Sequence, residues 1–132
     1  MSVVVGYVAT PEGTAALEAA AAEATTRGVR LVVILSERSS RFGADAPDVT
    51  RAATAVRERL AATTVEHDVR VVTQGRDVAE EIIEAAQESG AELIVIGLRR
   101  RSPVGKLLLG SNAQRILLDA PCPVLAVKPP SA

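Results

Sequence analysis

Apolar residues in this chain fall into five short runs that are separated by longer segments of mixed polarity. The first run, Val3 to Val8, is too short for a helix and is rich in β-branched residues, which predicts a buried strand. The other runs predict strands at 29–35, 69–72, 93–96 and 123–127. Each run is interpreted as apolar throughout, so the strands are predicted to be covered on both faces.

Helix signals occupy the segments between these runs. Thr10 is a suitable N-cap, Pro11 suits the first helical position and Glu12 places an acid in the first turn, so a helix is predicted from there to Gly28. After a polar loop, apolar residues at helical intervals predict a second helix over 49–60.

Two later helices begin with capping-box patterns. Asp77 with Glu80 predicts the start of a third helix, and Ser111 with Gln114 predicts the start of a fourth. The inner face of the third helix is expected to carry Val78, Ile82 and Ala86, and the fourth helix carries Ile116 and Leu117.

The alternation of strands and helices determines the predicted fold. Strand and helix follow each other along the whole chain, with one long loop before the fourth helix and no internal repeat. This order predicts an α/β fold, a three-layer α/β/α sandwich around an open five-stranded parallel sheet, in a single domain over residues 1–132. Ligands of such sheets bind beyond the carboxyl ends of the strands, where the strand order reverses.

Composition excludes several classes of function. The chain has 132 residues, a formal net charge of −1 and only 2% aromatic residues, so it offers little to nucleic acid or to an anionic membrane. The single Cys122 excludes an internal disulfide and a cysteine zinc site, and it is expected to be a small packed residue. The single His67 is expected in an exposed turn. Neither a leader nor a membrane-spanning run is recognised, which predicts a cytoplasmic protein.

The connection from Gly97 to Asn112 is the most unusual feature of the chain. It is about three times the length of a typical strand–helix connection, and it contains three consecutive arginines and a lysine. From Gly97 onward six basic residues stand against one acid, a local charge of +5. Backbone amides at a helix start, the helix dipole and these cations together predict a phosphate-binding site.

Other phosphate-binding and catalytic motifs are absent from the sequence. Gly105-Lys106 is followed by Leu107, so the hydroxyl of a Walker loop is missing. The first strand is not followed by the glycines of a dinucleotide site. The first and third strands end at Ala9 and Thr73 and not at the acids of a phospho-receiver domain, and no nucleophile stands beside a base.

The region from Ile96 to Val127 resembles the universal stress protein family. The motif of that family is a glycine, two residues, a second glycine, nine residues, and a glycine followed by serine or threonine. Gly97 matches its first position and Gly110-Ser111 matches its last pair. Residues 120–127 resemble the closing strand of the family, and the order of elements agrees over essentially the whole chain.

Two positions differ from the family pattern. Arg100 replaces the middle glycine of the motif, which adds bulk where the backbone of the family approaches the phosphates. ATP-binding members usually have an aspartate at the end of the first strand, whereas this chain has Ala9, preceded by Val8.

The resemblance implies a Rossmann-like fold of the adenine nucleotide alpha hydrolase type and a stress-response regulatory protein that binds an adenine nucleotide. ATP and AMP are the expected ligands, with Mg²⁺ accompanying ATP. The purine is expected between the ends of the first two strands and the phosphates at the start of the fourth helix. The expected contact residues are Tyr7, Val8, Ala9, Thr10, Leu35, Gly97, Arg99, Arg100, Gly105, Lys106, Gly110, Ser111 and Asn112.

Alternative functions remain open at this point. One is a dimeric interaction module of the same family that binds no nucleotide, with Arg100 filling the phosphate space. The direction of Arg100, into the pocket or away from it, separates this reading from the first. A slow ATPase is less favoured, because no general base or metal-binding acid is found near the loop. No catalytic residue and no metal site is assigned.

A homodimer is expected in either case. The last strand, Val124 to Val127, is predicted at a sheet edge, and an unprotected apolar edge favours pairing. In the family that the chain resembles, this strand pairs across a two-fold axis. Pro123 and Pro129 are expected to limit the pairing to a short segment.

Overall fold

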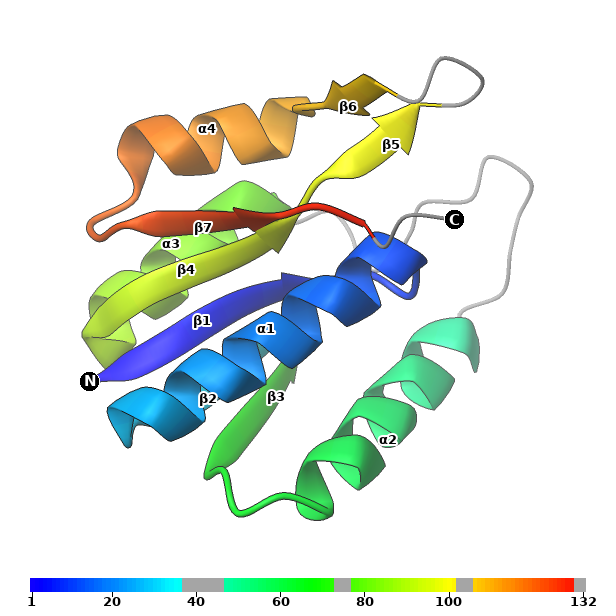
Figure 1. Cartoon of the computed structure of the whole chain (residues 1–132), viewed down its shortest axis with the longest axis vertical. Coiled ribbons are helices and arrows are strands. Elements are labelled where there is room, and N and C mark those ends of the chain that lie inside the picture. The colour runs from blue at the N-terminus through cyan, green and yellow to red at the C-terminus, as the bar shows by residue number, and fades with distance from the viewer. Residues whose placement is uncertain (37–46, 73–76, 102–105, 130–132) are drawn as a thin grey trace.

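The computed structural model describes residues 1–36, 47–72, 77–101 and 106–129 of the chain. Over these residues strands and helices alternate from the first strand to the last (Figure 1). The strands of the main sheet are β1 Ser2–Tyr7, β2 Arg30–Leu35, β3 His67–Val71, β4 Ala91–Gly97 and β7 Val124–Val127. The helices are α1 Pro11–Arg27, α2 Pro47–Ala61, α3 Val78–Ser89 and α4 Ser111–Asp119. The two remaining strands are β5 Arg99–Arg101 and β6 Lys106–Leu108.

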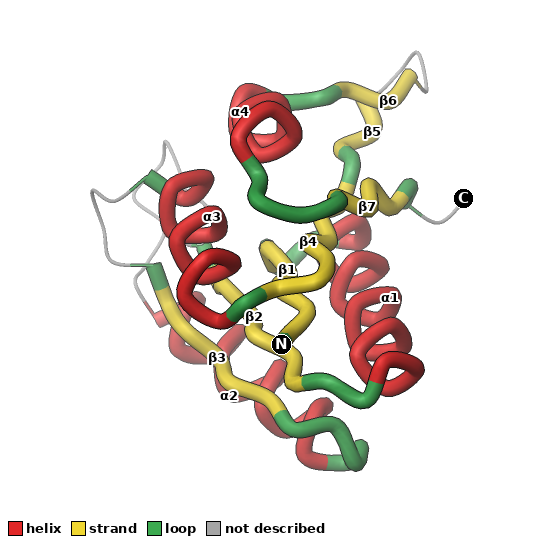
Figure 2. The backbone as a smooth tube through the Cα atoms, turned by 90° about the vertical axis from the view of Figure 1, so that its left-hand side faces the viewer, coloured by secondary structure: helices red, strands yellow, loops and turns green. Residues whose placement is uncertain are grey.

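The main sheet is parallel throughout and has the strand order β3-β2-β1-β4-β7. Helices α1 and α2 cover one face, and α3 and α4 cover the other, as Figure 2 shows from the side. The strand order reverses between β1 and β4, because the chain first builds outward to β3 and then returns to the far side of β1. The predicted three-layer α/β fold with an open five-stranded parallel sheet is confirmed.

Alternate residues of the central strands supply two separate cores. In β1, Val3 and Val5 belong to the cluster under α1 and α2, and Val4 belongs to the cluster under α3 and α4. The same alternation holds in β2 and β4, whose central residues are all buried. A strand with both faces covered must be apolar on both, which is why these segments read as unbroken apolar runs. Small alanines on the inner side of α1 allow that helix to lie close to the sheet.

The caps of α1 agree with the sequence. The hydroxyl of Thr10 accepts a hydrogen bond from the Gly13 amide at 3.1 Å, and Pro11 occupies the first helical position. At the other end Gly28 has a φ of 65°, a left-handed conformation that glycine adopts without the strain of a side chain. The helix therefore begins and ends where its residues require.

Strand β3 departs from the prediction. It begins at His67 and so includes charged residues, and its residues are half-buried or exposed instead of buried. The reason is its place at the edge of the sheet, where only one side of the strand has a neighbour. His67 is the first residue of this strand and is half-buried, with its Nδ1 2.9 Å from the Val65 carbonyl oxygen. The expectation of an exposed turn residue at His67 was wrong.

The connection predicted as a loop between β4 and α4 contains a hairpin. Strands β5 and β6 pair antiparallel, with Arg99 opposite Leu108 and Arg101 opposite Lys106. Three consecutive arginines show no alternation of polar and apolar residues, so this segment carries no local signal for a strand. Among the described residues, no helix is long and apolar enough to cross a membrane.

Candidate anion-binding site at the carboxyl ends of the strands

The reversal of strand order places the ends of β1 and β4 side by side. After β1 the chain passes to α1 on one face of the sheet, and after β4 it passes through the hairpin to α4 on the other face. In Figure 1 the strands of the main sheet run in one direction, and the amino end of α4 lies at the side where β1 and β4 end. This is the position where parallel sheets of this type bind ligands.

The turn between β1 and α1 is rigidly built. The Val8 carbonyl oxygen accepts a hydrogen bond from the Thr10 amide at 2.7 Å, and the Thr10 hydroxyl lies 3.5 Å from the same oxygen. A Cβ on Gly13 would lie 1.8 Å from this carbonyl oxygen, so the first turn of α1 packs directly on the turn. Ala9 is exposed at its tip, whereas Thr10 is half-buried.

The end of β4 contacts the first turn of α1. A Cβ on Gly97 would lie 2.5 Å from the Glu12 carbonyl oxygen, so only glycine permits this approach without a shift of the backbone. The structure thus brings together two segments, 7–10 and 97–99, that are far apart in the sequence. Leu98 follows the last residue of β4, and its amide donates a hydrogen bond to the Val127 carbonyl oxygen at the end of β7, at 2.8 Å.

Helix α4 begins without a side-chain cap. Its N-cap is Gly110, which makes no side-chain hydrogen bond, and Ser111 is the first helical residue. The predicted capping box of Ser111 and Gln114 was therefore wrong: the Gln114 side-chain amide donates instead to the Leu109 carbonyl oxygen at 3.0 Å. Because glycine takes the N-cap position, the serine hydroxyl stands one residue too late to cap.

The amino end of α4 also differs from those of α1 and α3 in charge. The first turn of α1 contains Glu12 and that of α3 contains Glu80 and Glu81, whereas the first turn of α4 contains no acid. Gly110, Ser111 and Asn112 are all exposed. The positive end of this helix dipole is accessible and is not neutralised by a carboxylate within its own first turn.

Arg115 joins α4 to the start of α3. Its Nη1 donates to Asp77 Oδ2 at 2.5 Å and its Nη2 donates to Glu80 Oε1 at 2.9 Å. Asp77 is the N-cap of α3, as predicted, and its Oδ1 accepts from the Ala79 amide at 2.9 Å. The Glu80 carboxylate, expected to reach back to the cap, bonds Arg115. The hydrogen bond from Arg115 to Glu80, with the nearby carboxylates, raises the pKa of the guanidinium.

Two of the predicted contact residues pack against the core and accept backbone hydrogen bonds within the fold. The Leu35 side chain is buried in the cluster under α1 and α2, and its carbonyl oxygen accepts from the Val72 amide at 2.9 Å. Tyr7 packs partly against the same cluster, and its carbonyl oxygen accepts from the Ser36 amide at 3.1 Å. Both residues stand at strand ends next to Val8.

Several predicted residues belong to the basic connection. Arg99 is exposed in β5. Gly105 lies outside the described residues, and so do the side chains of Arg100 and Lys106, although their backbones pair in the hairpin. The direction of Arg100, which separates the two sequence-based functions, is therefore among the features outside the described part.

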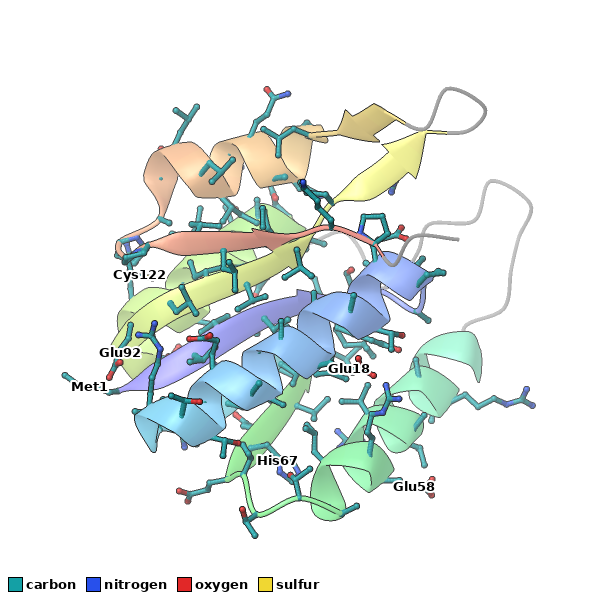
Figure 3. The ribbon with its side chains drawn as sticks, viewed as in Figure 1. Met1, Glu18, Glu58, His67, Glu92 and Cys122 are labelled. Atoms are coloured by element: carbon teal, nitrogen blue, oxygen red, sulfur yellow. The ribbon has the colours of Figure 1, made fainter. Side chains whose placement is uncertain are left out.

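The single histidine and the single cysteine lie away from this site. His67 is the first residue of β3 and Cys122 stands two residues before β7, so both lie at the amino ends of the strands, as Figure 3 shows. Cys122 packs against the cluster under α3 and α4, as expected of a small packed residue, and burial raises the pKa of its thiol. Among the described residues no group of three or more histidine, cysteine or acidic side chains is placed to hold a metal ion. The arrangement at the carboxyl ends is suited to binding an anion.

The side-chain contact between α3 and α4 was not predicted from the sequence. Arg115 and Asp77 are 38 residues apart. No local pattern links a basic residue in one helix to the cap of another. Only the packing of α4 on the same face as α3 brings the two side chains together.

Comparison with known proteins agrees with this geometry. Residues 1–128 match the model of the universal stress protein family. A universal stress protein of Mycolicibacterium smegmatis is 42% identical over 96% of this chain and 97% of its own length. The structure of a universal stress protein from Archaeoglobus fulgidus has a TM-score of 0.79 at 30% identity, over 97% of this chain and 98% of its own. A structure of the universal stress protein from Archaeoglobus fulgidus in complex with dAMP has a TM-score of 0.73 at 26% identity, over 97% of this chain and 98% of its own.

Proposed function

The chain belongs to the universal stress protein family, and we propose that it binds an adenine nucleotide, ATP or AMP, as a regulatory ligand. The observation that carries this proposal is the amino end of α4: exposed, without a side-chain cap, and without an acid in its first turn. The backbone amides at the start of this helix have no partner within the helix, and together with the helix dipole they favour a phosphate group at this position.

The charges around α4 support a phosphate ligand. Arg99 is exposed in the hairpin strand that leaves β4, and the chain from Gly97 onward has a strong excess of basic residues. In contrast, the whole chain has a net charge of −1, so the excess is local. Basic side chains next to the uncapped amides of α4 would attract a phosphate, and the amides would donate hydrogen bonds to it.

The nucleoside would lie at the ends of β1 and β2. The turn at Val8, Ala9 and Thr10 is fixed by its own hydrogen bonds, so it offers a preformed surface with an exposed apolar tip. The Leu35 side chain is buried, so a contact from that residue would come from its backbone. The relative from Archaeoglobus fulgidus in complex with dAMP supports an adenine mononucleotide as one ligand of this fold. Mg²⁺, where ATP is the ligand, would be held chiefly by the phosphates, because the described residues offer no acidic cluster for it.

Titration calorimetry tests this site directly. ATP, ADP, AMP and cyclic AMP would be titrated with and without Mg²⁺ into the wild-type protein and into Gly110→Asp. The aspartate is expected to cap α4 and place a negative charge where the phosphate rests, which lowers nucleotide affinity by about tenfold or more. Nothing lies within 4 Å of a Cβ at Gly110, so folding is expected to be unaffected or slightly improved.

The matched control is Gly28→Asp, the same change of charge at the C-cap of α1. That position lies at the opposite end of the sheet, so nucleotide affinity is expected to stay at the wild-type value. Wild-type protein that binds none of the four nucleotides would contradict the proposal and favour the interaction module that binds no nucleotide. Equal affinities of wild type and Gly110→Asp would exclude α4 as the site.

We also propose that two copies pair through β7. This edge strand contains Val124, Leu125, Ala126 and Val127, without a charged residue, and Leu125 is 37% exposed. The other edge strand, β3, contains His67, Asp68 and Arg70, and charges on an edge oppose pairing. The two edges therefore differ in the way expected if β7 joins a second copy across a two-fold axis.

Sedimentation velocity distinguishes the two edges. Leu125→Asp is expected to convert a dimer to monomers at micromolar concentration, because it would place like charges of the two copies close together on one face of the joined sheet. Val71→Asp places the same charge on the β3 edge at a residue of similar exposure, 43%, and is expected to leave the dimer intact. A monomeric wild-type protein, or a dimer that survives Leu125→Asp, would contradict this arrangement.

A further inference from the structure

We propose that Arg115 is a positioning residue, which sets the amino end of α4 against α3 and thereby sets the affinity of the anion site. This inference rests on the function proposed above. It concerns a residue outside the expected contact set, and it assigns to Arg115 no contact with the ligand.

Helix α4 is held to the rest of the fold by few buried groups. Ile116 is its single buried residue, at 2% exposure, and Ala113 is partly buried against the same cluster. In contrast, Leu117 is 44% exposed and Leu118 is 84% exposed. One buried isoleucine anchors a helix but leaves it free to pivot, so a second fixed point is needed to define its direction.

The Arg115 guanidinium supplies that second point. It bonds two carboxylates at once, Asp77 at 2.5 Å and Glu80 at 2.9 Å, and a planar fork with two partners fixes orientation as well as distance. Asp77 is itself held, because its other oxygen caps α3 through the amides of Ala79 and Glu80. The Asp77 carboxylate thus connects the first turn of α3 to α4.

Arg115 lies close enough to the proposed site for its contacts to fix the position of the first turn of α4. It follows Ser111 by four residues, one turn along the same side of α4. A shift of this turn would move the exposed amides of Gly110, Ser111 and Asn112 by a similar distance. Hydrogen bonds from these amides to an anion weaken steeply with misalignment, so the position of α4 controls affinity.

The acidic groups around Arg115 favour a role in positioning α4 over direct contact with the anion. Asp77 and Glu80 bond the guanidinium, and Asp119 lies at 3.9 Å from its Nε. Three carboxylates offset its single charge. An anion would therefore gain little electrostatic attraction by approaching the guanidinium. Arg115 acts on the ligand through the position of α4.

The test uses two variants that break the same contact from opposite sides. Arg115→Gln removes the guanidinium, and Asp77→Ser removes the Oδ2 partner while keeping a residue that caps helices well. Both are expected to lower nucleotide affinity by about threefold to tenfold, and the double variant is expected to lower it no further than the single ones. Arg115→Lys, which keeps the charge but not the fork, is expected to restore part of the affinity.

Arg27→Gln is the matched control. Arg27 also bonds two carboxylates, Glu23 and Glu92, each at 3.2 Å, and its exposure of 35% resembles the 42% of Arg115. Arg27 joins the carboxyl end of α1 to Glu92 near the start of β4, and Figure 3 shows Glu92 at the other end of the sheet. Its loss is expected to leave nucleotide affinity unchanged, although stability falls slightly.

Hydrogen exchange without ligand provides a readout that does not depend on nucleotide. In Arg115→Gln the amides of α4 are expected to exchange faster than in wild type, while those of α1 stay unchanged. Unchanged exchange in α4 would overturn the positioning role whether or not nucleotide binds. Faster exchange with wild-type affinity would overturn the link to the site but leave the proposed function standing. Absence of binding to the wild-type protein would overturn the proposed function itself, and with it the link.

Discussion

Replacement of Gly13 by alanine is expected to destabilise this protein by about 3 kcal/mol or more. The added Cβ would lie 1.8 Å from the Val8 carbonyl oxygen, and neither atom can turn away without a movement of the backbone. A flexible side chain could turn away, but here the turn after β1 or the first turn of α1 must move. Either movement would also weaken the 3.1 Å hydrogen bond from the Gly13 amide to the Thr10 hydroxyl.

Chemical denaturation of Gly13→Ala beside Gly28→Ala checks this expectation. Gly28 has a φ of 65° and nothing within 4 Å of a Cβ, so its replacement costs conformational strain alone, about 1 kcal/mol. Gly13→Ala is expected to lower the denaturation midpoint by clearly more. Equal midpoints would show that the turn after β1 relaxes easily and is not rigid.

Replacement of Leu35 by alanine is expected to cost about 2–5 kcal/mol, the second of the two large effects. Leu35 is 1% exposed and lies in the cluster under α1 and α2, at the end of β2. Removal of most of its side chain leaves a cavity next to α1 that a well-packed sheet cannot close. Thermal unfolding followed by circular dichroism measures this loss.

The same variant separates a structural role from a binding role at Leu35. Since the side chain faces the core, nucleotide affinity is expected to stay within about twofold of wild type at temperatures where the variant is folded. A loss of affinity with little change in stability would show instead that this side chain contacts the ligand. Titration at two temperatures below the unfolding transition distinguishes the two results.

The element order and most element starts were predictable because their causes are local. Thr10, Pro11 and Gly28 define α1 by the preferences of those residue types, and the structure confirms all three. Asp77 caps α3 as its sequence predicts. The central strands are recognised from residues that must be apolar on both faces. Edge strand β3 and hairpin strands β5 and β6 were less predictable, because their boundaries depend on which neighbours they pair with.

The candidate site was predictable in its location but not in its construction. Gly97 and Gly110-Ser111 are recognised by their spacing, and both lie toward the carboxyl ends of the strands. However, the approach of Gly97 to the Glu12 backbone could not be read from either segment. The burial of Leu35, next to residues that were expected to form the site, was equally hidden.

The sequence by itself determined the family, the α/β fold and the basic connection before α4, since these follow from residue types and their spacing along the chain. The tertiary structure alone decided that Gly110 leaves α4 without a side-chain cap and that Arg115 bonds Asp77 and Glu80. Local preference acts over a few residues, whereas these contacts join helices that meet only because both pack on one face of the sheet. Their residues are 35 and 38 positions apart, a separation at which neither spacing nor periodicity carries information.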